Sequence, residues 1–554
     1  MQANSIGHRG QRAAAILIAA LMITGTAGCQ SGSSSGTGNQ TASAVSDNFN
    51  QTGLPILKEK ETYNIMVGQM STVASAANKQ CVKDAEKATN IHVEWTEVPT
   101  SSWDEKVNLL FASNQLPDAI IGNVDVAQYG KLLTPLGDYI DKYAPAVQKL
   151  FQERPDYPPA LSDSEGSIMG LPIGDESTHN IIDSQMWVNQ KWLDKLGLKI
   201  PTTTDEFENM LQEFKTKDPN GNGKVDEIPF TFTSAWGWSS SVENLFGSFG
   251  APESDEHVFL DPSDGKTVVF SPEQDGYYKC LKWLHGLYSK GLLDSQVFTQ
   301  AGDSYDTKNA GKDIIGVDMS YGTGMLGNDD ITVANIPNLK GPDGKDMLVK
   351  NNVTRKPGFT IPRTCKHPEV MVRFYDYLNT DLETVLDWDR GTKDLTWRYV
   401  KDEDKLDASV QAAEIYHTSD EWKKLGFESA SDARSQTSFA GWSPALYTQG
   451  VEKKYGTLSP EPDIKLNAVK NDLSKGVDGL PTGTAKADNI SQRTLIRTDL
   501  DNYLKKFIAN SVINGIDDNA WKAHQEKLKS LKCDQYKQLC QEYVDNVAKL
   551  KKAE

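Results

Sequence analysis

A short loop between residues 218 and 227 has the residue types and spacing of a calcium site. Oxygen-bearing side chains occupy positions 1, 3, 5 and 9 of the loop, and Gly223 stands at position 6, where the chain must turn sharply. Pro229 replaces the usual Glu at position 12, so we expect Glu227 at position 10 to substitute for it. The alternative is an Asn- and Gly-rich surface turn that binds nothing. The predicted ligands of a structural Ca²⁺ are Asp218, Asn220, Asn222, Lys224 through its backbone carbonyl, Asp226 and Glu227.

A second group of residues has side chains suited to holding a sugar. Sugars present apolar C–H faces, which pack on aromatic rings, and a rim of hydroxyls, which bond to carboxylates, amides and guanidinium groups. The alternative for each candidate is a place in the core or in a solvated turn. The candidates are Trp236, Trp238, Tyr321, Trp388 and Trp442 among the aromatic residues, and Asn123, Asp125, Asp175, Glu176 and Arg390 among the polar ones.

Most of these candidates follow an expected strand, where a sheet edge can present them to a ligand. The first part of the chain predicts a β-α-β-α-β order, which is typical of a parallel sheet covered by helices. Ligands of such sheets bind at the carboxyl ends of the strands. A second unit is expected to begin near residue 185, with helices at 190–196, 206–215 and 272–290 and strands at 228–232 and 313–319.

The first 58 residues are typical of an export signal and a tether. His8, Arg9 and Arg12 precede an apolar run of eleven residues, 13–23, which is too short to cross a bilayer and fits a secretory signal. Small residues before Cys29 resemble a bacterial lipobox, although Thr26 stands where Leu is usual. We therefore expect a signal peptide over 1–28, and a lipidated Cys29 with a flexible tether over 29–58. The alternative is a plain signal peptide with a free product.

The composition narrows the class of protein. The chain has 554 residues, with 58 Lys and Arg against 76 Asp and Glu, a net charge of −18. A protein that tracks nucleic-acid phosphates needs a basic surface, so we expect no nucleic-acid partner. The eight His show no metal-ligand spacing.

Four segments together give the chain a family likeness. They are residues 103–110 with 116–118, residues 192–197 with 201–207, the calcium loop with 227–229, and residues 270–272 with 281–294. With them the chain resembles the extracellular solute-binding lipoproteins (family 1) of bacterial carbohydrate ABC importers, in the branch of alginate-binding and LplA-like proteins, which has a similar calcium loop.

The resemblance implies an α/β, two-lobed fold like that of periplasmic binding proteins (type II), with a ligand cleft between the lobes. We expect the N-terminal lobe to comprise residues 59–174 and 305–360, and the C-terminal lobe residues 175–304 and 361–554. The implied function is capture of an oligosaccharide by a monomer on the extracellular face of the cell membrane and its delivery to ABC permease subunits. Contact with the membrane would be through the lipid only, and no enzyme activity is expected.

Other classes stay open from the residues alone. A secreted glycoside hydrolase needs only two carboxylates, which a chain with 76 acids always has. A peptide-binding lipoprotein and a cell-wall-interaction lipoprotein are further alternatives. The acidic balance mildly disfavours a strongly anionic sugar, unless calcium or local arginines such as Arg390 and Arg398 compensate.

Overall fold

The computed structural model describes residues 46–553, apart from 71–72, 183, 236–239, 241, 309–311, 324–325, 327–332 and 460–462. The expected signal peptide, Cys29 and the candidates Trp236 and Trp238 lie outside the described residues. The tether was expected to continue to residue 58, but its last part is packed. Phe49, Ile56 and Leu57 are buried in the core of the first lobe, because three apolar side chains here can leave water together.

The first lobe is built on a five-stranded sheet with the order β2-β1-β3-β12-β4. Its strands β1, β2 and β3 are parallel, with Ile65 opposite both Trp95 and Ala119. Alternation along β1 places Ile65 and Val67 in one core and Met66 in another, on opposite faces of the sheet. The strands are β1 (Glu61–Gln69), β2 (Ile91–Pro99), β3 (Ala119–Ile121), β4 (Leu171–Pro172) and β12 (Pro357–Thr360).

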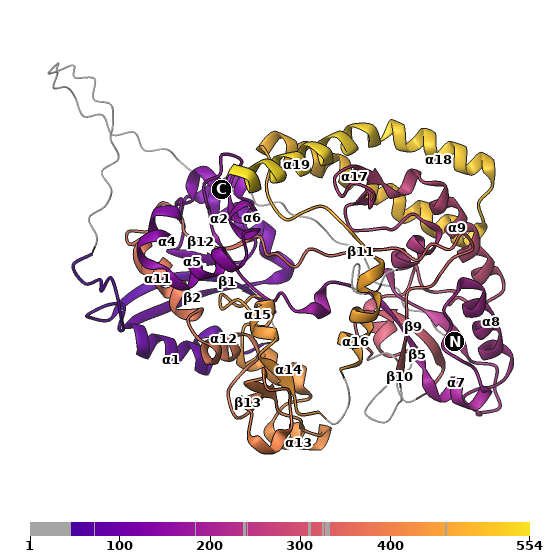
Figure 1. Ribbon diagram of the computed structural model, residues 1–554, viewed down its shortest axis with the longest axis horizontal. Helices are drawn as coiled ribbons and strands as arrows, with labels where there is room; N and C mark the ends of the chain where they lie inside the picture. The colour runs from indigo at the N-terminus through magenta and orange to yellow at the C-terminus, as the bar shows by residue number, and fades with distance from the viewer. Residues whose placement is uncertain are drawn as a thin grey trace, which may run out of the picture. The chain divides into compact units, whose positions relative to one another are not determined.

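Helices cover this sheet and extend the lobe (Figure 1). The apolar face of α11 packs on α4 and α5, and Val370 and Phe374 join the same core as Ile65. The helices are α1 (Gln80–Thr89), α2 (Trp103–Ser113), α3 (Val126–Tyr129), α4 (Gly137–Tyr143), α5 (Pro145–Glu153), α6 (Tyr157–Leu161), α11 (Pro368–Leu378) and α12 (Leu382–Asp389).

The second lobe is built on a four-stranded sheet with the order β10-β5-β9-β6. Its helix α8 shows why the sequence folds this way. The Thr203 hydroxyl accepts from the Glu206 amide at 3.2 Å and caps the helix, and Phe207 and Phe214 lie on the buried face. The elements are β5 (Gln185–Asn189), β6 (Ile228–Thr231), β9 (Ile315–Ser320), β10 (Val333–Ile336), α7 (Gln190–Leu196), α8 (Thr204–Thr216), α9 (Asp275–Ser289), α10 (Gly302–Asp306) and α16 (Ile464–Asp472).

The C-terminal helices also belong to the second lobe, as Ile508 and Val512 share its core. Residues 521–551 form parts of two helices, because the chain turns at Lys532, whose φ is +62°. These helices are α17 (Ala487–Asn514), α18 (Asp518–Ser530) and α19 (Cys533–Ala553), and the short strand pairs beside them are β7 (Val258–Leu260) with β8 (Val268–Phe270) and β11 (Leu348–Lys350) with β16 (Gly476–Asp478).

The expected division of the chain between the lobes was wrong in two places. Residues 305–360 were placed in the first lobe, but β9 and β10 join the second sheet, and only β12 joins the first. All six residues of β9 are buried, which requires a partner on each edge, and β5 and β6 provide them. Residues from 361 to about 457 were placed in the second lobe, but Ile361, Phe374 and Phe439 lie in the core of the first.

The remaining part of the first lobe is a small sheet with short helices. Trp397 and Ala412 of this sheet pack on Leu386 of α12. The elements are β13 (Trp397–Tyr399), β14 (Ala412–Glu414), β15 (Tyr455–Thr457), α13 (Ser419–Leu425), α14 (Ala430–Thr437) and α15 (Gln449–Glu452). Among the described residues, no helix combines the length and the apolar character needed to cross a membrane.

Candidate ligand-binding cleft

Three adjoining cavities mark the candidate site. The central cavity, of about 720 Å³, is lined from the first lobe by Arg434 and Gly441, from the second by Glu256 and Arg493, and from a connecting segment by Arg355. A tyrosine-rich cavity of about 550 Å³, which includes Tyr447 and Tyr455, shares Asp175, Tyr321 and Arg434 with it. An acidic cavity of about 310 Å³, which includes Glu243 and His257, shares Ser254, Asp255 and Arg497 with it. Volumes of this size are typical of small-molecule sites.

Asp175 and Arg390, both predicted from sequence, meet at the tyrosine-rich cavity. A guanidinium nitrogen of Arg390 lies 2.9 Å from a carboxylate oxygen of Asp175 and 2.9 Å from one of Asp389, and Arg434 lies 3.6 Å and 3.0 Å from the same two groups. Burial would raise the pKa of Asp175, but the charges of Arg390 and Arg434 outweigh it and lower that pKa to about 2. The four side chains therefore form a neutral, rigid network, with Arg390 stacked 3.6 Å from the centre of the Tyr447 ring.

Tyr321 lies where the sequence predicted a cleft edge. It directly follows β9 and lines both the central and the tyrosine-rich cavity. Its hydroxyl donates to the side-chain oxygen of Asn180 at 2.9 Å, and the ammonium group of Lys465 lies over its ring. Asn180 belongs to the segment that connects β4 of the first lobe to β5 of the second, so Tyr321 sits where the two lobes meet.

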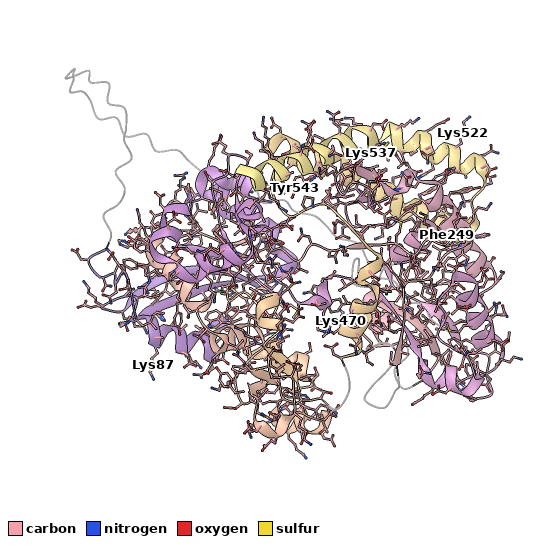
Figure 2. All side chains as sticks on the ribbon, in the orientation of Figure 1. Lys87, Phe249, Lys470, Lys522, Lys537 and Tyr543 are labelled. Atoms are coloured by element: carbon pink, nitrogen blue, oxygen red, sulfur yellow. The ribbon has the colours of Figure 1, made fainter. Side chains whose placement is uncertain are left out.

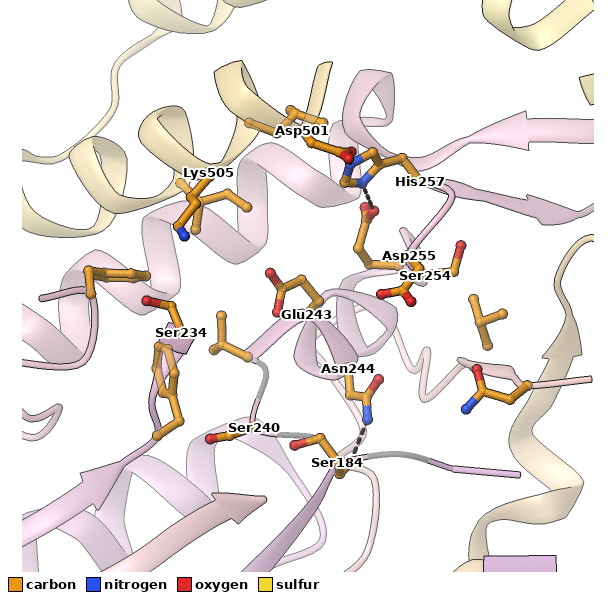
Figure 3. A pocket seen from close by; sticks show the side chains of 18 of the residues that line it. Ser184, Ser234, Ser240, Glu243, Asn244, Ser254, Asp255, His257, Asp501 and Lys505 are labelled. Atoms are coloured by element: carbon orange, nitrogen blue, oxygen red, sulfur yellow. Dashed lines mark hydrogen bonds and ion pairs between the residues drawn. The ribbon is translucent and has the colours of Figure 1, made fainter. Parts of the chain in front are cut away.

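The acidic cavity has Glu243, Asn244 and Lys505 in its lining. Figure 3 shows Glu243 pointing into this cavity, with Lys505 of α17 on one side and Asn244 on the other. Burial raises the pKa of Glu243 to about 7. Ser234 and Ser240, which flank residues 236–239, both line this cavity.

Two of the residues predicted to bind the ligand are packed inside the protein and lie away from the cavities. Glu176 is fully buried, where Arg154 donates to it at 2.7 Å and the Tyr157 hydroxyl also donates. Trp388, expected in a loop, lies in α12, and its ring stacks on Phe439 in the core of the first lobe. Neither side chain lines one of the three cavities.

Asn123, Asp125 and Trp442 gather near the carboxyl ends of β1 and β3. The Trp442 and Trp103 ring centres are 5.5 Å apart, and the Trp103 indole N–H donates to the Asn123 carbonyl at 2.7 Å. Asp125 caps α3 by accepting from two of its backbone amides. These three residues are absent from the lining of the three cavities, although Gly441, next to Trp442, lines the central one.

The predicted calcium loop joins α8 to β6. The Asp218 carboxylate accepts the backbone N–H groups of Gly221 at 3.0 Å, Asn222 at 3.1 Å and Gly223 at 3.1 Å. The Asn222 amide donates to Asp226 at 3.0 Å. One carboxylate oxygen of Glu227 is buried with no hydrogen-bond partner, and burial together with the charges of Asp218 and Asp226 raises the pKa of Glu227.

Sequence reasoning missed most of the cationic wall of the central cavity. Arg493 and Arg497 stand one helical turn apart on α17, a spacing that the sequence contains but that gives no sign of a cleft. Arg355 and Lys356 come from the segment before β12, about 140 residues away in the chain. Arg398, which was considered from the sequence, is held by Asp404 at 2.7 Å and lies outside the three cavities.

Comparison with known proteins identifies the class. The family described as bacterial extracellular solute-binding protein matches residues 68–381, more than half of the chain. The chain therefore belongs to the bacterial extracellular solute-binding proteins, as its sequence resemblance predicted, and its two-lobed α/β fold is that of the family.

Individual relatives can be named. The fructooligosaccharide ABC transporter substrate-binding protein FusA of Streptococcus pneumoniae is 28% identical over 515 residues, 88% of this chain and 91% of FusA. The structure of FusA with kestose has a TM-score of 0.71 at 26% identity, covering 88% of this chain and 99% of FusA, and an EF-hand mutant of FusA with fructo-nystose matches equally.

Two further structures share the fold. An HMO-binding solute-binding protein from Bifidobacterium longum infantis has a TM-score of 0.70 at 21% identity and covers 88% of this chain and 99% of its own. The alginate-binding protein AlgQ2, in a structure without calcium ion, has a TM-score of 0.66 at 19% identity and covers 90% of this chain and 99% of its own.

Proposed function

We propose that this protein is a membrane-anchored receptor that captures an oligosaccharide between its lobes and delivers it to the permease of an ABC transporter. The observation that carries the proposal is the row of three adjoining cavities, which share lining residues and together combine aromatic rings with charged hydrogen-bonding groups. Tyr321 and the partly buried Tyr455 offer rings to sugar faces, and Asp175, Asn180 and Arg434 offer partners to hydroxyls. FusA, at 28% identity, is named for fructooligosaccharides and supports a sugar as the solute.

Trp236 and Trp238 remain candidates for stacking on the sugar. Their support is indirect, since Ser234 and Ser240 on either side of them line the acidic cavity. Trp442 and Asn123 are candidates for an outer part of the cleft, at the edge where ligands of parallel sheets bind. Closure of the lobes around the ligand is the expected motion, without covalent chemistry.

We also propose that the loop from Asp218 to Glu227 holds a structural Ca²⁺. The unpartnered buried oxygen of Glu227, beside the carboxylates of Asp218 and Asp226, fits a cation at this place. Asn220 and Asn222 turn their amide nitrogens toward Asp226 here, and a half-turn of each amide would offer oxygens instead. The FusA EF-hand mutant supports a comparable loop in a relative. The ion would fix the α8–β6 connection without touching the solute.

The proposed location of the receptor at the membrane rests on Cys29 and the tether after it. Lipidated Cys29 would hold a monomer on the extracellular face of the cell membrane, and the tether would keep it near the permease subunits at a high local concentration. A palmitate-labelling experiment on the native protein and its Cys29→Ser variant tests this anchor. Label retained by the variant contradicts it.

The function is tested by a ligand screen. Purified protein is heated with a panel of oligosaccharides and with a panel of peptides, and the unfolding temperature is followed. An oligosaccharide present at 100 times its dissociation constant adds about 2.7 kcal/mol to the free energy of unfolding. Stabilisation by peptides alone would contradict the sugar, and release of reducing ends from a bound sugar would identify a hydrolase. Scattering that shows no closure with any ligand would favour a cell-wall-interaction lipoprotein.

A further inference from the structure

The central cavity is lined by twice as many basic as acidic side chains, although the whole chain carries a net charge of −18. The acidic side chains are Asp175, Asp255 and Glu256. The basic side chains are Lys350, Arg355, Lys356, Arg434, Arg493 and Arg497. A positive cavity in an acidic protein needs an explanation in terms of either internal pairing or a ligand.

Internal pairing accounts for three of the six cations. Arg434 lies 3.0 Å from Asp389, Arg497 lies 2.8 Å from Glu256, and Lys350 lies 2.9 Å from Asp478. Arg355, Lys356 and Arg493 form no ion pair with an acidic side chain in the part of the chain that the structure describes.

Two of these three side chains also hold unused hydrogen-bond donors. The Nε atom of Arg355 and an Nη atom of Arg493 are buried from water, and neither has a hydrogen-bond partner among the described residues. A buried donor of a charged group without a partner is costly. An acceptor brought by a ligand would remove that cost for both groups.

The two arginines are held in place by their surroundings. The Arg493 guanidinium lies 4.3 Å from the centre of the Tyr543 ring, and the Tyr543 hydroxyl donates to the carbonyls of Pro481 at 3.0 Å and Gly483 at 2.8 Å. Tyr543 projects from α19, where Figure 2 labels it. The backbone amide of Arg355 lies 3.4 Å from the Tyr157 hydroxyl, just ahead of β12.

The cations of this wall act on one another. The pKa of Lys356 is lowered by its packing against the cavity wall and by the positive charges of Arg493 and Arg497, against the opposing effect of Glu256, although the residue keeps an exposed surface. A negative group in the cavity would relieve this repulsion, and it would stabilise the protonated lysine.

We propose that the central cavity recognises an oxyanion carried by the bound oligosaccharide, with Arg355 and Arg493 as its donors and Lys356 as a further positive charge. The oxyanion is the carboxylate of a uronic acid or the sulfate of a sulfate ester, since both offer acceptor oxygens that match the planar guanidinium fork. This inference rests on the proposed function and narrows its solute to an acidic oligosaccharide. It replaces the weak expectation from the net charge that anionic sugars are disfavoured.

The test compares matched pairs of sugars by isothermal titration calorimetry. One pair is trigalacturonate and the same trisaccharide with its carboxyls reduced to alcohols, and the other is a sulfated trisaccharide and its desulfated form. We expect the anionic member of one pair to bind at least tenfold more tightly than its neutral counterpart at low salt. The pair that shows this preference distinguishes a carboxylate from a sulfate, and the preference falls as salt is raised.

Variants then test whether Arg355 and Arg493 cause the preference for the anionic sugar. Arg493→Gln and, separately, Arg355→Gln are expected to reduce the ratio of the affinities for the anionic and the neutral member by tenfold or more. Lys506→Gln is the matched control, because Lys506 is exposed on the same helix α17 and lines none of the three cavities. Thermal unfolding without ligand confirms that each variant is folded, and with two independent arginine variants one unfolded variant does not decide the result.

The outcomes separate the two proposals. Equal or tighter binding of the neutral members, or a preference that both arginine variants retain, overturns the oxyanion site and leaves the oligosaccharide receptor standing. Failure of a broader panel of neutral and acidic oligosaccharides to bind overturns the proposed function and the oxyanion site with it.

Discussion

Replacing Asp175 by Asn tests whether the network at the tyrosine-rich cavity stabilises the folded protein through charge. The substitution keeps the shape of the side chain, and the amide oxygen can still accept from the Ser177 amide, which now donates to Asp175 at 2.6 Å. It removes one of two carboxylates that neutralise Arg390 and Arg434. Asp389, which is fully buried, would then be left to balance two guanidinium groups.

The size of the effect follows from the pKa of Asp175. That pKa is lowered from 3.8 to about 2 by Arg390 and Arg434 acting against burial. One pKa unit corresponds to about 1.4 kcal/mol, so the charged form contributes roughly 2 kcal/mol at pH 7. Because the pKa is lower in the folded state, this contribution is present above pH 4 and is lost as the pH falls toward 2. At pH 3 roughly half of it remains.

The assay is urea unfolding of the native protein and the Asp175→Asn variant, followed by tryptophan fluorescence at several pH values from 7 to 3. The variant should be less stable by roughly 2 kcal/mol at pH 7, and the difference should shrink at pH 3. Asp499→Asn is the control, because Asp499 is exposed on α17 and its replacement should change stability by less than about 0.5 kcal/mol. A variant as stable as the native protein at pH 7, or a difference that does not shrink in acid, would refute the charge argument.

Three further outcomes are expected. Chelation of calcium should lower the unfolding temperature of the native protein and should have little effect on that of Asp226→Asn. If the ion was at 100 times its dissociation constant, its removal lowers the free energy of unfolding by about 2.7 kcal/mol. Equal responses of the two proteins would contradict the site. Gly122→Ala should reduce the free energy of unfolding by about 2 kcal/mol or more, since a Cβ there would come within 2.1 Å of the Trp103 ring. A Cβ at Gly137 meets nothing within 4 Å, so Gly137→Ala should be nearly neutral. Similar stabilities of the two variants in chemical unfolding would refute the packing argument. Glu176→Gln should destabilise the protein by roughly 2–3 kcal/mol, as measured by urea unfolding, because Arg154 and Tyr157 lose a buried charged acceptor, and an unchanged midpoint would count against this role.

Much of the fold could be predicted because the local patterns were strong. The alternation of Tyr63, Ile65 and Val67 predicted a strand where β1 lies, and the helix predicted at 206–215 lies within α8. The lobe to which a segment belongs depends on which strands it pairs with. Residues of β9 and β12 are similar in their apolar character, yet β9 pairs in the second sheet and β12 in the first, and no local pattern distinguishes them.

The sequence also could not predict which side chains of the candidate site face the cavities. Asp175 and Glu176 are neighbours in an extended segment, so their side chains point to opposite sides of the chain. Asp175 consequently lines two cavities, whereas Glu176 is fully buried between Arg154 and Tyr157. The sequence identified the dipeptide, but only the packing of the surrounding elements decides which of the two acids faces the cleft.

The net charge of the whole chain does not predict the charge of the central cavity. The net charge of −18 is spread over the surface, where salt screens each charge beyond about 8–10 Å. Arg355 and Arg493 line the central cavity without an ion-pair partner among the described residues, so a ligand there meets their charge at short range. An acidic exterior is therefore compatible with a cleft that selects an acidic sugar, and the local arginines, instead of the chain total, set the preference that the titrations measure.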